Sequence, residues 1–96
     1  MAETQDAYVK RLEAEIDRWS AEIDRLKAQA EKAEADAELE YEERLKELRE
    51  RRDDARARAV ALAEATAGAW EELKKGARDA VDTLKGSIEE ARREFD

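Results

Sequence analysis

Hydrophobic residues recur at alternating spacings of three and four along the first third of the chain. They occupy Val9, Leu12, Ile16, Trp19, Ile23, Leu26, Ala30, Ala33 and Ala37. This spacing is that of a coiled-coil seam, in which one narrow helical face packs against a partner helix. The seam is bulky up to Leu26 and consists of alanines from Ala30 onward. The pattern therefore predicts a helix that self-associates through these positions.

The same helix is expected to continue well beyond the seam. Strong helix formers fill residues 4–65, and neither glycine nor proline interrupts them. Thr4 is a suitable N-cap for this helix. Beyond Ala37 the apolar spacing shifts to four, four and three, at Tyr41, Leu45 and Leu48. Such a stutter relaxes a supercoil without ending the helix, so we expect one helix over about 4–65, roughly 90 Å long.

A short turn at about residues 66–68 is expected to separate this helix from a second one over about 69–95. Gly68 interrupts the pattern, and apolar positions of helical period resume directly after it. A kink at Gly86, where Ser87 and Glu90 match a capping box, is the alternative to a continuous second helix. The two helices should form an antiparallel hairpin. The residues expected to pack within it are Leu45, Leu48, Leu62, Trp70, Leu73, Val81, Leu84 and Ile88.

The lengths of the two helices lead to a prediction about assembly. The second helix can reach back only to about residue 40, so it leaves the seam uncovered. Exposing each large apolar side chain of the seam would forfeit roughly 1.5–3 kcal/mol. We therefore expect an antiparallel homodimer about a dyad near residues 33–40, in which each end is a three-helix bundle. A parallel dimer is the alternative.

Composition and charge narrow the range of partners. The 96 residues form at most one domain, 1–96, and a monomer this small and polar favours oligomerisation. The net charge of −8 argues against nucleic acid or anionic lipid as the main partner. No apolar run approaches the length of a membrane span, and the N-terminus lacks the basic segment followed by an apolar segment that marks a secretory signal. We expect a cytoplasmic protein.

The residue types needed for most catalysis are missing. The sequence contains no histidine and no cysteine, which removes the usual bases, nucleophiles and soft metal ligands. The carboxylate pairs, such as Glu31 with Glu34, are interpreted as solvated faces, and no glycine-rich phosphate loop is present. Five arginines between residues 49 and 58 alternate with acids and are interpreted as an ion-paired face. We expect no enzyme, no cofactor and no metal site.

Three segments carry a resemblance to a known family. They are YVKRLEAEIDRWSAEIDRLKA (8–28), AEADAELEYEERLKELR (33–49) and GAWEELKKGARDAVDTL (68–84). Over nearly its whole length the chain resembles short bacterial coiled-coil proteins that are labelled stress-response proteins. The resemblance implies an all-helical soluble protein that is induced under stress and has no established activity. The C-terminal part also resembles the amphipathic helices of phasins, which coat polyester storage granules.

The expected function is therefore a non-enzymatic coiled-coil homodimer with a structural or interaction role in the stress response. The alternative is an amphipathic helix that binds a lipid or storage-granule surface, or a protectant that becomes ordered on contact. The second helix, with Trp70, Val81, Ile88 and Phe95 on one face, suits that alternative. A third class is an adaptor whose charged faces bind a protein client that the sequence does not identify.

Overall fold

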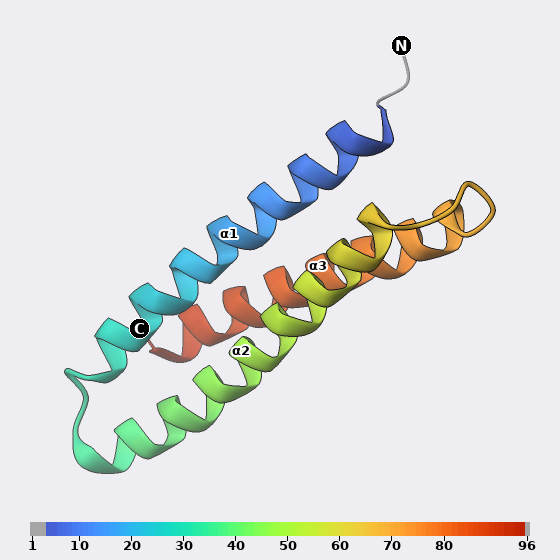
Figure 1. Ribbon diagram of the computed structural model, residues 1–96. Coiled ribbons are helices and arrows are strands. Elements are labelled where there is room, and N and C mark those ends of the chain that lie inside the picture. Colours follow the sequence, from blue (N-terminus) through green and yellow to red (C-terminus); the bar gives the residue numbers. More distant parts are fainter. Residues whose placement is uncertain (1–3, 96) are drawn as a thin grey trace.

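The chain folds into a bundle of three helices. The structure is a computed structural model that describes residues 4–95. Helix α1 spans Gln5–Ala30, α2 spans Ala35–Ala63 and α3 spans Trp70–Phe95. Each helix packs against both others, and the chain reverses direction at each of two short connections (Figure 1). The bundle measures 51 × 21 × 16 Å. The predicted all-helical fold is thus confirmed for the described residues.

The prediction of one helix over 4–65 is wrong. A turn at Glu31–Glu34 ends α1 and starts α2, and it brings α1 back along the other two helices (Figure 1). Opening a helix here loses a few backbone hydrogen bonds, each worth about 1 kcal/mol. Burying six large apolar side chains recovers roughly 1.5–3 kcal/mol apiece. Burial of the seam therefore outweighs the strong helix propensity of the turn.

The turn is built without the residues that usually form turns. Glu31 keeps right-handed helical angles, and the N–H groups of Lys32 and Ala33 donate to the carbonyls of Gln29 and Ala30 at 3.1 Å each. Glu34 is extended, with φ −65° and ψ 154°, and its side chain makes no capping hydrogen bond. Among residues 4–95 no residue has a positive φ. The reversal thus combines a tightened helix end with an extended residue at Glu34.

The other helix boundaries lie close to the predicted ones. Thr4 is the N-cap of α1, as expected, and its Oγ1 accepts a hydrogen bond from the Ala7 N–H at 3.1 Å. The second turn occupies residues 64–69, slightly more than the expected 66–68. Helix α3 is continuous through Gly76 and Gly86, in agreement with the continuous second helix that was one of the two alternatives.

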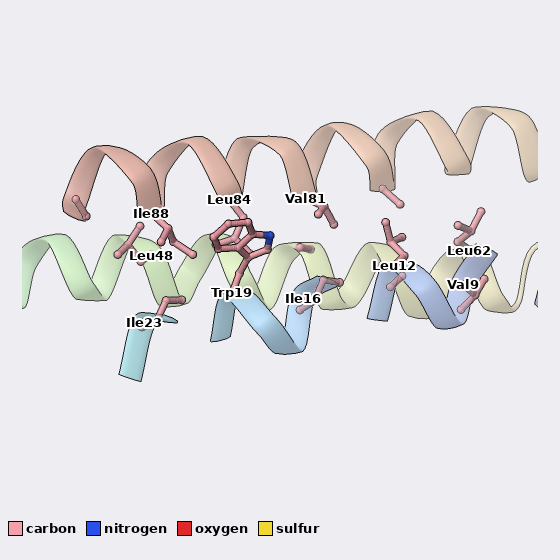
Figure 2. Close-up of a cluster of buried hydrophobic side chains, with 14 of the residues drawn as sticks. Val9, Leu12, Ile16, Trp19, Ile23, Leu48, Leu62, Val81, Leu84 and Ile88 are labelled. Carbon is pink, nitrogen blue, oxygen red and sulfur yellow. The ribbon is translucent and has the colours of Figure 1, made fainter. Parts of the chain in front are cut away.

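One hydrophobic core runs between the three helices. Figure 2 shows side chains from α1, α2 and α3 together filling the space between the ribbons. Leu12, Ile23, Leu48 and Leu84 are each at most 1% exposed. A side chain enclosed in this way contributes about 1.5–3 kcal/mol relative to an exposed one, so this core is the main source of the fold's stability.

Candidate functional site: the α1 interface and its polar rim

The strongest predicted site, the seam, is buried inside its own chain. We call the α1 interface the contact between the buried face of α1 and the faces of α2 and α3 that cover it. The buried residues of α1 are Tyr8, Val9, Leu12, Ile16, Trp19, Ile23, Leu26 and Ala30, each at most 7% exposed. The premise that the seam finds no sufficient partner within one chain is therefore wrong, because the turn at Glu31–Glu34 supplies that partner. Ala33 and Ala37 lie half-buried, outside the core.

The residues predicted to pack α2 against α3 lie in the same core. Those that are buried are Leu45, Leu48, Leu62, Trp70, Val81, Leu84 and Ile88. Leu73 is half-buried and packs against the core. The predicted self-association and hairpin residues are thus neighbours in one cluster, whereas the sequence suggested two separate surfaces.

Aromatic pairs close both ends of the core. At one end the rings of Tyr8 and Trp70 meet edge to face, with centroids 6.1 Å apart and planes at 76°. The Lys74 Nζ lies 4.8 Å from the centroid of the Tyr8 ring, a cation–π geometry. At the other end Tyr41 and Phe95 are 4.0 Å apart. Because each pair joins two different helices, the ends of the helices are held together as well as the middle.

Arg78 of α3 is the main charged link to α1. Its guanidinium donates two hydrogen bonds to the Glu15 carboxylate, at 2.7 and 3.2 Å, and two to Asp82, at 2.8 and 3.1 Å. The hydrogen bond with Glu15 raises the pKa of Arg78 above its ordinary value, with Asp82 adding to the effect. A paired fork of this kind fixes both the distance and the rotation of α1 relative to α3.

Arg44 makes the corresponding link between α2 and α3. It donates to both carboxylate oxygens of Glu94 and, at 3.2 Å, to Glu90. The hydrogen bond with Glu94 raises the pKa of Arg44, and the same bond lowers the pKa of the Glu94 carboxyl. Each partner thus stabilises the charged form of the other.

The arginines of the middle of α2 reach across to the neighbouring helices. Arg51 donates to the Ser87 Oγ of α3 at 2.7 Å, and Arg52 donates to the Ser20 Oγ of α1 at 3.3 Å. Farther along, Arg56 pairs with Asp17 of α1 at 3.3 Å. The expected ion-paired face is therefore also an interhelical rim. Its cross-helix partners were missed because sequence spacing reveals only pairs within one helix.

The described surface contains several open hollows. One, between α1 and α2, is lined by Glu13, Ile16, Asp17, Arg56, Ala59 and Val60. Within residues 4–95 no group of three metal-binding side chains is clustered. None of the described helices combines the length and apolarity that crossing a membrane requires. The most distinctive arrangement in the described structure is thus the α1 interface itself.

The fold and this interface define a small, highly charged three-helix bundle. Comparisons with protein-family models, with curated proteins and with solved structures find no match to the chain. Inference about its function therefore rests on its sequence and on the geometry described above.

Proposed function

We propose that the protein is a non-enzymatic homodimer with a structural or interaction role, used in the bacterial stress response. The observation that carries the proposal is the α1 interface, which is apolar and extends along most of the bundle. An interface of this kind suits helix association, and the same surfaces can serve between chains as well as within one. The role under stress is supported by the resemblance of residues 8–28, 33–49 and 68–84 to coiled-coil stress-response proteins.

The use of the polar residues supports a structural role as well. Arg44, Arg51, Arg52 and Arg78 all contact another helix through hydrogen bonds or ion pairs. The whole sequence lacks histidine and cysteine. The carboxylates that remain would have to act without the bases and nucleophiles on which most enzymes depend. The contacts that these arginines make between helices are enough to explain their presence.

In the proposed dimer, α2 and α3 form the antiparallel hairpin, and α1 of either chain covers it. The test is the mass by light scattering on a size-exclusion column, with far-UV circular dichroism on the same fractions, across a hundredfold dilution. A highly helical dimer that persists on dilution supports the proposal. A protein that stays monomeric at every concentration overturns the homodimer. Loss of stress survival on deletion of the gene, restored by complementation, tests the cellular role.

A second function is favoured by one property of α3. Of the three helices it has the most one-sided distribution of apolar residues. If the bundle opened, that face could bind a lipid or storage-granule surface. In this case addition of vesicles would convert the bundle to a vesicle-bound form and change its tryptophan emission. A dimer that is unaffected by vesicles would leave the structural role as the better proposal.

A further inference from the structure

We propose that two copies of this chain exchange α1, with the turn at Glu31–Glu34 as the hinge. In the exchanged dimer, α1 and α2 of each chain join into one long helix. The α1 of one copy then covers the α2 and α3 of the other. This inference rests on the proposed homodimer and adds to it the contacts by which the dimer forms.

The first support is the composition of the hinge. Its four residues are all helix formers, with no glycine or proline and no positive φ. The folded turn leaves Glu34 without a side-chain cap and interrupts the helical hydrogen bonding between α1 and α2. Extending the hinge as helix restores those hydrogen bonds. Short hinge loops can promote domain exchange, and this hinge has only four residues.

The second support is that exchange loses none of the buried contacts of the α1 interface. We call the single chain, in which α1 packs on its own α2 and α3, the closed chain. In it, α1 contacts the rest of the molecule through its buried face and through pairs such as Glu15 with Arg78. Every one of these contacts can form between two chains, because the partner's α2 and α3 are identical. The balance between the closed chain and the dimer is then set by the hinge and by concentration.

The third support is the register of α1 against α2. Asp17 lies against Arg56, and Ser20 lies against Arg52. If these pairings continue along two extended helices, the dyad falls near residue 36. The residues around it include Ala33, Ala35 and Ala37, whose small side chains let two helix axes approach closely. The small side chains near the dyad favour the close approach of two helices that the exchanged dimer requires.

A proline at the hinge tests the proposal. Ala35 is the first residue of α2 and is exposed, and Glu34 before it already has the extended conformation that proline demands of its predecessor. Ala35→Pro thus fits the closed turn, whereas proline in the interior of the extended helix breaks it. We expect dimerisation to weaken by about a hundredfold or more, with the helicity of the monomer retained.

The matched control is Gly68→Ala in the other turn, where an added Cβ meets no atom within 4 Å. It should leave the dimer unchanged. If Ala35→Pro dimerises as tightly as the parent chain, the hinge does not extend and exchange is overturned.

A distance measurement separates failure of exchange from failure of the homodimer. Glu13 and Val60 line the same hollow in the closed chain, and both are exposed. In one extended helix they would be about 70 Å apart. Spin labels on Glu13→Cys/Val60→Cys are read by pulsed electron resonance, with the labelled chain diluted into excess unlabelled protein. The sequence has no cysteine to interfere.

Each outcome decides between the proposals. A dimeric mass with a label distance of about 70 Å supports exchange. A dimeric mass with the labels still close together overturns exchange and leaves the homodimer standing. A monomeric mass at every concentration overturns both.

Discussion

At the scale of single residues, the fold gives several arginines a role that the sequence pattern did not indicate. Arg78 and Arg44 were visible only as members of a highly charged chain, yet each joins two helices through a carboxylate. Such pairs at the surface are individually weak because water and ions screen them. A forked geometry across two helices is stronger than an exposed pair within one.

The link between α1 and α3 can be tested at Arg78. Replacing it by alanine removes two hydrogen bonds to Glu15, and the side chains of both residues are about one-third exposed. We expect Arg78→Ala to lower the free energy of unfolding by about 1 kcal/mol, measured by urea denaturation. Arg25→Ala is the control, because Arg25 is 77% exposed and pairs with Glu22 of its own helix. Equal losses in the two variants would contradict an interhelical role for Arg78.

The pairing of Glu94 predicts how stability depends on pH. The hydrogen bond from Arg44 lowers the pKa of the Glu94 carboxyl in the folded protein below its ordinary value of 4.5. A group with a lowered folded pKa stabilises the fold above its unfolded pKa, and this stability is lost as the pH falls through the folded pKa. Arg44 stays charged throughout this range. The unfolded protein therefore takes up the proton on Glu94 before the folded protein does.

The variant Glu94→Gln isolates this effect. It should be less stable than the parent chain at pH 7, and the difference should shrink as the pH falls below about 4.5. The measurement is a set of urea midpoints for both proteins between pH 7 and pH 3. A difference that is the same at every pH would mean that Glu94 does not stabilise the fold through its charge.

At the scale of helices, stability depends on burial of the seam. Ile23 lies in α1 and is 0% exposed. Ile23→Ala should destabilise the protein by about 2–5 kcal/mol, because it leaves a cavity as well as removing apolar contact. The measurement is chemical denaturation followed by circular dichroism. The control is Leu39→Ala at a residue that is 68% exposed, which should change stability by no more than about 0.5 kcal/mol. A small effect at Ile23 would argue against the α1 interface.

The sequence predicted most of the helical pattern but not the first turn. Periodic apolar residues located the buried faces, and Thr4 located the start of α1. The turn at Glu31–Glu34 was missed because it lacks glycine, proline and a capping side chain. What produces it is the burial of α1 against helices formed much later in the chain, a tertiary effect that local propensity does not contain. The change from bulky residues to alanine after Leu26 was the one local signal.

Ser87 shows the same limit at another point of the chain. Its spacing from Glu90 matches a capping box, which led to the alternative of a kink at Gly86. In the structure Ser87 lies within α3, away from its ends. Its side chain is buried and accepts a hydrogen bond from Arg51 of α2. A polar residue in a helix can form a hydrogen bond with a neighbouring helix or cap the end of its own helix. The spacing of residues alone does not distinguish the two roles.

At the scale of the whole molecule, negative charge gathers at the end that holds the proposed hinge. Between residues 31 and 43 the acids are Glu31, Glu34, Asp36, Glu38, Glu40, Glu42 and Glu43, with Lys32 as the one base. In the closed chain these residues belong to the turn between α1 and α2 and to the first part of α2, at one end of the bundle (Figure 1). In an exchanged dimer with its dyad near residue 36, Asp36 of one copy faces Asp36 of the other, and Glu34 faces Glu38. Like charges therefore oppose exchange.

Salt should shift this balance toward the dimer. Screening shortens the range of these repulsions from about 10 Å at 0.1 M salt to about 3 Å at 1 M. We expect the dimer dissociation constant to fall by about tenfold or more over that range, measured by analytical ultracentrifugation.

Removing the charges by Glu34→Gln, Asp36→Asn and Glu38→Gln together should tighten the dimer at low salt and flatten its salt dependence. The control makes the same charge change at Glu13, Glu71 and Asp79, far from the hinge along the chain. If both triple variants respond alike, net charge alone governs the dimer. If only the hinge variant responds, the repulsion is local and the two copies meet at the turn between α1 and α2.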